Sequence, residues 1–299
     1  MIFVANVLVM NGGTTFLIRT CREISRRNRK CAVILLRDEY DVDLLIELKR
    51  YATVIHLSNF LRCNGLLFRG HLSIFGLVDW VRLKLALSPF LDQIHVMSIF
   101  GLVFVLRLAA CKVNSPITAG VYHQNEFLYR APPFYFAKKA IRLFASIPTS
   151  NIIFFNEVTR SNYQTFFDKN YSMSIIAPIG IDIRKINNVA TAGDSSRIVS
   201  VGNLVNFKTY NAHIIRMMAR LRMKYPNVCY EIYGTGPEEF TLRALTVELG
   251  VEECVHFMGV LPYSKFDQVV ANAVVFVGSG TALIEAAALG VPALIGIES

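Results

Sequence analysis

Short apolar runs alternate with amphipathic segments along most of this chain. An apolar run of strand length, followed by a segment with helical apolar spacing, predicts a β-strand and then an α-helix. In the first half the pattern predicts strands at Ile2–Met10, Ala32–Leu36, Thr53–Leu57, Gln93–Met97, Ile117–Val121, Asn151–Phe155 and Ser174–Ile176. It predicts helices at Phe16–Arg29, Asp41–Tyr51, Ile99–Cys111, Pro133–Ser146 and Glu157–Phe167. The stretch Phe60–Phe90 is the least regular part and mixes basic residues with Leu, Phe and the single Trp80.

A polar, small-residue segment, Lys185–Arg197, interrupts the alternation and is the expected linker. The pattern then restarts, with strands predicted at Ile198–Val201, Val228–Tyr233, Val255–Phe257, Val274–Val277 and Ala293–Ile297. Helices are predicted at Tyr210–Lys224, Glu238–Leu249, Pro262–Ala271 and Thr281–Leu289. Repeated strand–helix units imply parallel strands with right-handed crossovers. We therefore predict an α/β protein with two domains, residues 1–187 and 188–299.

The stretch Val274–Pro292 carries the clearest candidate chemistry. Its strand breaks at Gly278-Ser279-Gly280, and the helix from Thr281 begins directly afterwards. Such a turn leaves backbone N–H groups uncovered at a helix start, where the helix dipole also favours an anion. Glu285 lies four residues after Thr281 and so on the same helix face. A phosphate-binding turn beside a carboxylate suits a phosphate that is attached to a sugar, as in a nucleotide.

Several other glycines come just after predicted strands, at the carboxyl ends that form the ligand crevice of an open parallel sheet. In the second half these are Gly202, Gly234, Gly236, Gly259, Gly278 and Gly280. Lys208 follows Gly202 and precedes a predicted helix, so its ammonium could neutralise a diphosphate; the alternative is a solvated loop lysine. In the first half, Gly12-Gly13 lies between the first strand and the first helix, where the alternative is a tight turn.

Other motifs in the first half are less specific. The GxGxxG pattern is absent at Gly12-Gly13, which counts against a nicotinamide enzyme. The string Asp41-Val42-Asp43 could suggest a metal–nucleotide site, but it opens a predicted helix, and we favour a helix cap. His123 follows a predicted strand, where it is either a hydrogen-bond donor or general base near a sugar, or a structural histidine.

The composition favours an anionic partner and is consistent with contact with a membrane surface. Of the 299 residues, 53% are hydrophobic and 18% are charged, and the formal net charge is +9. This excess of positive charge favours an anionic partner: nucleotide phosphates, lipid headgroups or nucleic acid. The run Val96–Val113 is interrupted by Arg107 and is too short to span a bilayer. Peripheral attachment through the apolar and basic region Phe60–Val113 is the alternative that we retain.

The cysteines and the N-terminus bear on the compartment. The six cysteines form no CxxC pair and lie in apolar segments, as buried thiols of a reducing compartment do. Met1 leads directly into strand-like sequence, so we expect no signal peptide. A cytoplasmic protein, with peripheral contact at an inner membrane face, is the expectation.

At this point the second half resembles the donor-binding domain of GT-B glycosyltransferases, in particular the large retaining group 4 family. The matching features are Val201-Gly202 with Lys208, Tyr233–Pro237, Val255–Gly259 and Ser279–Pro292. The first half is similar more loosely, through Gly12-Gly13, Asp92–Ser98, His123 and Pro178–Asp182. The resemblance implies two Rossmann-like domains that face each other across a cleft.

The resemblance also implies an activity and roles for individual residues. A nucleotide-sugar donor would bind mainly to the second domain, and a glycan or lipid-linked acceptor to the first, in cell-surface polysaccharide synthesis. Lys208 would hold the donor diphosphate, Glu285 the ribose, and His123 would lie near the transferred sugar. Catalysis would stabilise the departing diphosphate, with no metal and no cofactor. The expected donor-binding set is Gly12, Gly13, Gly202, Asn203, Lys208, Gly234, Gly236, Gly278, Ser279, Gly280, Thr281 and Glu285.

Three departures from the family pattern keep alternatives open. Asn203 replaces a usual Arg or Lys, and Val277 stands where a second Glu is usual. The chain stops at Ser299, before the βα units with which family members continue, so we expect the second domain to be incomplete. One alternative is a catalytically impaired nucleotide-sugar-binding remnant. Another is a sugar-nucleotide epimerase, for which Glu126 and Asp182 are the candidate proton-transfer residues. We see no nucleic-acid-binding motif.

Overall fold

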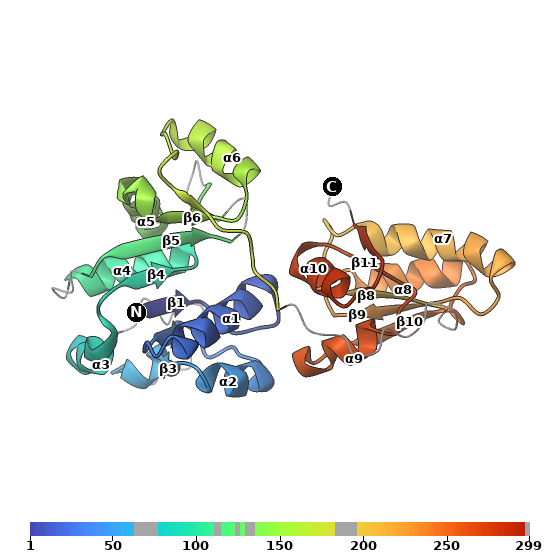
Figure 1. Ribbon diagram of the computed structural model, residues 1–299, viewed down its shortest axis with the longest axis horizontal. Coiled ribbons are helices and arrows are strands. Elements are labelled where there is room, and N and C mark those ends of the chain that lie inside the picture. The colour runs from blue at the N-terminus through green and yellow to red at the C-terminus, as the bar shows by residue number, and fades with distance from the viewer. Residues whose placement is uncertain (63–76, 111–114, 123–125, 129–134, 183–195, 297–299) are drawn as a thin grey trace. The chain divides into compact units, whose positions relative to one another are not determined.

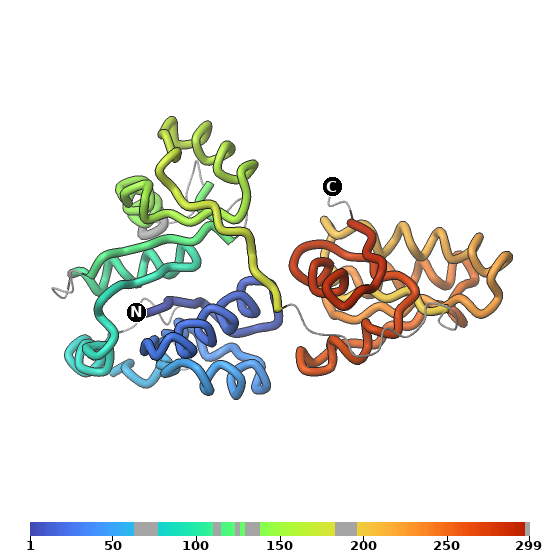
Figure 2. Tube along the Cα trace, in the orientation of Figure 1, coloured from blue at the N-terminus to red at the C-terminus, as the bar shows by residue number. Residues whose placement is uncertain are grey.

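The computed structural model describes residues 1–62, 77–110, 115–122, 126–128, 135–182 and 196–296. The chain divides into two compact units, Met1–Ile179 and Gly180–Ser299, and completes the first before it enters the second (Figures 1 and 2). The predicted boundary between residues 187 and 188 lies outside the described residues.

Within its described residues, the first unit contains a seven-stranded parallel sheet in the order β3-β2-β1-β4-β5-β6-β7. Every neighbouring pair of strands is parallel. The sheet is Rossmann-like, because the strand order reverses its direction between β1 and β4. The strands are β1 (Ile2–Ala5), β2 (Ala32–Leu35), β3 (Thr53–His56), β4 (Ile94–Val96), β5 (Ile117–Val121), β6 (Ile152–Phe154) and β7 (Ile175–Ile176).

Helices cover both faces of this sheet (Figure 1). Since parallel crossovers are right-handed, α1 and α2 lie on one face, and the helices that follow β4 lie on the other. Strands β1, β2 and β4 are entirely buried, which is why they read as unbroken apolar runs. The helices are α1 (Gly12–Arg26), α2 (Val42–Lys49), α3 (Trp80–Leu87), α4 (Ile99–Ala110), α5 (Tyr135–Ser146) and α6 (Glu157–Phe167).

The second unit contains a five-stranded parallel sheet in the order β10-β9-β8-β11-β12, again counted over its described residues. Its strands are β8 (Arg197–Val201), β9 (Cys229–Tyr233), β10 (Val255–Gly259), β11 (Val275–Gly278) and β12 (Ala293–Ile295). Its helices are α7 (Tyr210–Lys224), α8 (Glu239–Glu248), α9 (Phe266–Val270) and α10 (Gly280–Ala288). One core packs α7 and α8 against the sheet, and a second core packs α9 and α10 against its other face.

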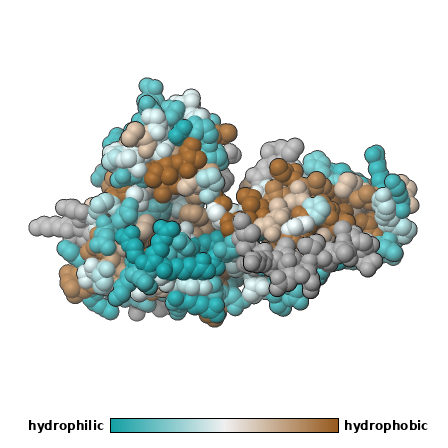
Figure 3. Space-filling model, viewed as in Figure 1, coloured by the Kyte–Doolittle hydropathy of each residue, from teal (hydrophilic) through white to brown (hydrophobic). Residues whose placement is uncertain are grey.

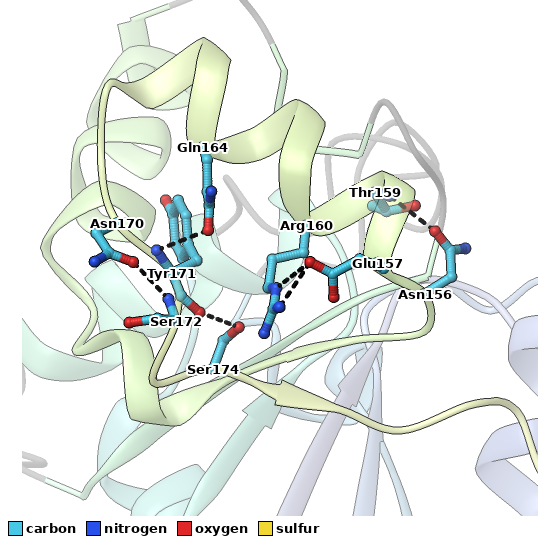
Figure 4. Close-up of polar contacts among 9 residues, drawn as sticks. All are labelled: Asn156, Glu157, Thr159, Arg160, Gln164, Asn170, Tyr171, Ser172 and Ser174. Atoms are coloured by element: carbon cyan, nitrogen blue, oxygen red, sulfur yellow. Dashed lines mark hydrogen bonds and ion pairs between the residues drawn. The ribbon is translucent and has the colours of Figure 1, made fainter.

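Short polar contacts fix the turns between these elements. At α6, the Asn156 side chain accepts a hydrogen bond from Thr159 N at 2.8 Å (Figure 4). Beyond the helix, Tyr171 N donates to the Gln164 side chain at 3.3 Å, and Ser174 Oγ donates to Tyr171 O at 2.6 Å. These bonds close the turn that returns the chain to β7.

Several predicted elements differ from the structure in their extent, and one helix was not predicted. The strand predicted at Ile2–Met10 ends at Ala5, and Leu8 beyond it forms an isolated bridge with Tyr40. The helix predicted at Phe16–Arg29 begins earlier, at Gly12, and ends at Arg26. The helix predicted at Pro262–Ala271 is shorter and spans Phe266–Val270. Within the stretch that looked irregular, Asp79 caps a regular helix, α3, by accepting a hydrogen bond from Arg82 N at 3.2 Å.

The described cysteines behave as the sequence predicts. Cys21, Cys31 and Cys254 are buried, Cys229 is partly buried, and none of these four forms a disulfide. Cys63 and Cys111 lie outside the described residues. Over the described parts of the chain, no helix is both long enough and apolar enough to cross a membrane.

A buried polar cluster anchors the carboxyl end of β5 to β4. His95 Nδ1 lies 2.9 Å from Thr118 Oγ1, and His95 Nε2 lies 2.7 Å from the Tyr122 hydroxyl. The Tyr122 ring folds back over Gly120, where a Cβ would lie 2.3 Å from the ring. Burial lowers the pKa of His95 to about 4, so the imidazole is neutral at physiological pH.

The Asp41-Val42-Asp43 string is a helix cap, as favoured from the sequence. The Asp41 carboxylate accepts hydrogen bonds from Asp43 N at 2.9 Å and from Leu44 N at 3.1 Å. We expect Asp41→Ala to lower the free energy of unfolding by about 1 kcal/mol and Asp41→Asn to cost less, because the amide oxygen can still cap. Urea unfolding measures this difference. If added metal ions stabilised the original protein but not Asp41→Asn, the string would instead be a metal site.

The His95 cluster predicts a dependence of stability on pH. The pKa of His95 is lower in the folded protein than its ordinary value of 6.5. As the pH falls, the unfolded state therefore takes up a proton on His95 before the folded state does. Stability is therefore full above about pH 6.5 and falls by roughly 3 kcal/mol as the pH drops toward 4. Urea unfolding at a series of pH values measures this loss. His95→Gln should flatten the dependence in this range, and an unchanged slope in that variant would assign the loss to another group.

Candidate functional site

The strand order of the second unit creates a switch point between β8 and β11. These strands are parallel neighbours, but α7 leaves β8 over one face of the sheet and α10 leaves β11 over the other. Their carboxyl ends therefore open into a space that neither crossover helix fills. Most of the sequence-predicted donor residues lie at or after the ends of these two strands: in the loop after β8, at Gly278 and Ser279, and in α10.

Lys208 lies directly over the end of β8. A Cβ placed on Gly202 would be 3.4 Å from Lys208 Nζ and 3.3 Å from the Tyr210 hydroxyl. The ammonium thus lies over the end of the strand. The turn between Val205 and Lys208 is held by Lys208 N, which donates a hydrogen bond to Val205 O at 3.0 Å. Lys208 is partly exposed, while Tyr210 is buried. The neighbouring Asn203 is exposed.

The start of α10 lies at the end of the adjacent strand. Gly280 has a left-handed φ of +66°, and a Cβ there would have no heavy atom within 4 Å, so the turn borders open space. Ser279 occupies the N-cap position without a side-chain capping bond. The first amides of α10 can therefore face a ligand. Thr281 and Glu285 are both partly exposed and lie one turn apart on α10.

Two of the predicted donor residues have a packing role beside the site. A Cβ on Gly234 would lie 1.9 Å from Gly202 O, and one on Gly236 would lie 2.1 Å from Leu204 O. The loops after β8 and β9 can touch only because both residues lack side chains. Leu204 N donates to Thr235 O at 3.0 Å across this contact. Gly234 and Gly236 thereby support the backbone at Gly202.

Tyr210 is a site residue that the sequence analysis missed. Its hydroxyl lies over Gly202, and its ring occupies the space that a Cβ on Gly296 would need, at 2.4 Å. Gly296 N in turn donates to Gly278 O at 2.7 Å. Tyr210 thus ties together the ends of β8, β11 and β12. Its only signal in the sequence is its position as the first residue of the helix after Lys208.

The first unit has its own switch point, between β1 and β4. Gly12 and Gly13 begin α1 after β1, where the Asn11 side chain accepts a hydrogen bond from Thr14 N at 2.9 Å. On the β4 side, the Glu126 carboxylate accepts a hydrogen bond from Ile99 N, the first residue of α4, at 3.3 Å. Burial raises the pKa of Glu126, and the Ile99 amide opposes that shift. His123 lies outside the described residues.

The arrangement can bind an anion and a neighbouring polyol group. In the second unit it brings together the Lys208 ammonium, the Gly202 backbone and the start of α10 at adjacent strand ends. Glu285 lies on the same helix, one turn further along. In the described part of the chain, no group of three or more His, Cys, Asp or Glu side chains could hold a metal ion.

Part of the second unit matches a known protein family. Residues 182–296 match the family model described as "Glycosyl transferases group 1". A glycosyltransferase of Haemophilus influenzae, described as uncharacterized, is 28% identical over 107 residues, which are 36% of this chain and 29% of the relative. A GDP-mannose-dependent alpha-(1-6)-phosphatidylinositol monomannoside mannosyltransferase of Mycolicibacterium smegmatis is 27% identical over 168 residues, 48% of this chain and 44% of the relative. The matches thus span less than half of either relative.

Solved structures resemble the whole chain. The Staphylococcus aureus protein TarM, in complex with UDP, superposes with a TM-score of 0.70 at 11% identity, over 99% of this chain and 85% of that one. Anabaena HepE, in complex with UDP and glucose, has a TM-score of 0.68 at 16% identity, over 98% and 79%. WaaG, a glycosyltransferase involved in lipopolysaccharide biosynthesis, has a TM-score of 0.67 at 16% identity, over 98% and 80%. The second unit therefore carries a glycosyl transferase group 1 domain, and the chain as a whole has the GT-B glycosyltransferase fold.

Proposed function

We propose that the protein transfers a sugar from a nucleotide-sugar donor to a glycan or lipid-linked acceptor in the synthesis of a cell-surface polysaccharide. One observation carries the proposal. The Lys208 ammonium lies over Gly202 at the carboxyl end of β8, beside the strand whose end opens into α10. The cation and the helix start together suit a diphosphate, the leaving group of such a transfer.

In this proposal the second unit binds the donor. Lys208 and the first amides of α10 hold the diphosphate, and Glu285 accepts hydrogen bonds from the ribose hydroxyls. Negative charge grows on the diphosphate as the glycosidic bond breaks. Hydrogen-bond donors and cations that face the diphosphate stabilise the transition state more than the ground state. We propose that these groups perform the reaction without a metal and, on the family resemblance, with retention of anomeric configuration.

The names of the relatives support a nucleotide-sugar donor. The Mycolicibacterium relative is named as GDP-mannose-dependent, and the TarM and HepE structures contain UDP. We propose that the acceptor binds to the first unit, near Gly12 and Gly13 at the start of α1.

Two features favour a second candidate, a nucleotide-sugar-binding protein that is impaired in catalysis. Asn203 supplies no second cation, and Val277 is 3% exposed within β11, so no carboxylate stands there. The epimerase alternative has less support. Its candidate base, Glu126, is engaged with the Ile99 amide at the start of α4.

We also propose that a peripheral contact with an anionic inner membrane face, if the acceptor is lipid-linked, runs through α3. Val81 and Leu85 are 67% and 68% exposed and lie four residues apart on one face of α3, and Leu77, which precedes the helix, is 68% exposed. Arg82 and Lys84 are exposed beside them. Apolar side chains flanked by cations suit the boundary between headgroups and acyl chains.

Removal of the Lys208 ammonium tests the diphosphate site. We expect Lys208→Ala to weaken the binding of UDP or GDP by roughly tenfold to a hundredfold, because one charge-assisted interaction is lost. Isothermal titration calorimetry measures this, with Lys49→Ala on α2 as the matched control. Equal affinities for Lys208→Ala and the control would remove Lys208 from the site.

Glu285 is tested by comparing two ligands. Because its proposed partner is the ribose, we expect Glu285→Ala to weaken nucleoside diphosphate binding roughly tenfold and to leave inorganic pyrophosphate binding unchanged. Lys208→Ala should weaken both. A Glu285→Ala variant that loses pyrophosphate as well would show that the carboxylate acts on the phosphate loop and not on the sugar.

A further inference from the structure

Helix α7 presents basic and apolar side chains to solvent. Its exposed residues are His213, Arg216, Met217, Arg220, Met223 and Lys224, and the helix contains no acidic residue. Its opposite side buries Ile214, Ile215 and Met218 in the core. Arg216, Arg220 and Lys224 follow one another at four-residue spacing, so they form a single ridge.

This ridge keeps its positive charge. Among the described residues, neither Arg216 nor Arg220 forms an ion pair or a side-chain hydrogen bond. Lys224 Nζ lies 5.2 Å from the centre of the Tyr225 ring, which leaves its charge in place. Arg222 of the same helix, which is not part of the ridge, forms an ion pair with Glu253 at 2.6 Å.

Helix α8, which contacts α7, also exposes apolar side chains. Phe240 and Val247 are 82% and 63% exposed, and Ala244 between them is exposed as well. The crossovers from β8 to β9 and from β9 to β10 run in the same direction, so α7 and α8 cover the same face of the sheet. Both helices pack on one core and lie next to each other (Figure 1).

Exposed apolar side chains are a general feature of this unit, and hydrophobic residues gather on its viewed surface (Figure 3). The α7–α8 face, which we define as Arg216, Arg220, Met223, Lys224, Phe240 and Val247, combines such side chains with cations. On α8, Glu239 is paired with Arg243 at 2.8 Å, and Glu248 is exposed at the end of the helix. Met223 is 80% exposed and directly precedes Lys224, the last residue of the ridge. Large apolar side chains this exposed mark a contact surface when they cluster.

We propose that the α7–α8 face is a docking surface of the second unit for an anionic lipid bilayer. Guanidinium groups bind lipid phosphates, and each cation near an anionic surface adds to the attraction. Met223, Phe240 and Val247 enter the interfacial layer, which removes their surface from water. Exposed apolar side chains beside cations suit a bilayer, whose headgroups are anionic and whose acyl layer is apolar. Docking through this face does not require catalysis by the protein.

The test is vesicle binding by the full-length chain. Sedimentation with vesicles of phosphatidylglycerol and phosphatidylcholine should capture the protein, and vesicles of phosphatidylcholine alone should capture far less. We expect the double variant Arg216→Glu/Arg220→Glu to reduce the partition coefficient on anionic vesicles at least about tenfold. Arg29→Glu/Lys30→Glu, with the same change of charge in the first unit, should reduce it much less. Phe240→Ser/Met223→Ser should also lower it at constant charge.

Three results would overturn the proposal. The first is equal vesicle binding by Arg216→Glu/Arg220→Glu and the Arg29→Glu/Lys30→Glu control. The second is binding that only Arg82→Glu/Lys84→Glu removes, which would assign the whole contact to α3. The third is a dimer of the protein, seen by light scattering, that the α7 variants dissociate while their vesicle binding persists. The α7–α8 face would then contact a second copy of the chain and not a bilayer. All variants change exposed side chains only, and circular dichroism confirms that each has folded.

Discussion

The parallel pairing of β8 with β11 is the constraint on which the candidate site depends. Val275 lies opposite Ile198 and Phe276 opposite Val199, so the two strands end side by side. Their helices leave over opposite faces of the sheet, and no crossover covers the space above the strand ends. That pairing alone brings a loop that carries Lys208 next to the start of α10, although more than 70 residues separate them in the sequence. The proposed chemistry follows from this juxtaposition.

The glycines of the second unit divide into two physical roles. Gly280 has a left-handed backbone and open space where a side chain would lie, as a residue at a ligand-facing turn requires. Gly234 and Gly236 instead allow two loop backbones to touch, and any side chain there would collide with Gly202 or Leu204. In the sequence these glycines looked alike, because each follows a strand. Only the packing separates the turn that can meet a ligand from the turns that hold it in place.

Much of the fold was predictable, because buried parallel strands and amphipathic helices leave periodic patterns. The predicted bounds of Ile117–Val121, Glu157–Phe167 and Tyr210–Lys224 are those of β5, α6 and α7. Helix α3 was missed because its outward face is apolar at Val81 and Leu85, which hides the helical period. Tyr210 and His95 were missed for another reason. Their contacts join strand ends that are distant in sequence, and no local pattern records them.

The central claim is that the loop after β8 and the start of α10 form one nucleotide site. Hydrogen–deuterium exchange of the backbone amides, with and without a saturating nucleoside diphosphate, tests it most directly. If these two segments form one site, exchange should slow at residues 202–210 and 279–285 together, with the same dependence on ligand concentration. Slower exchange at only one of these segments, or at neither of them, would contradict it.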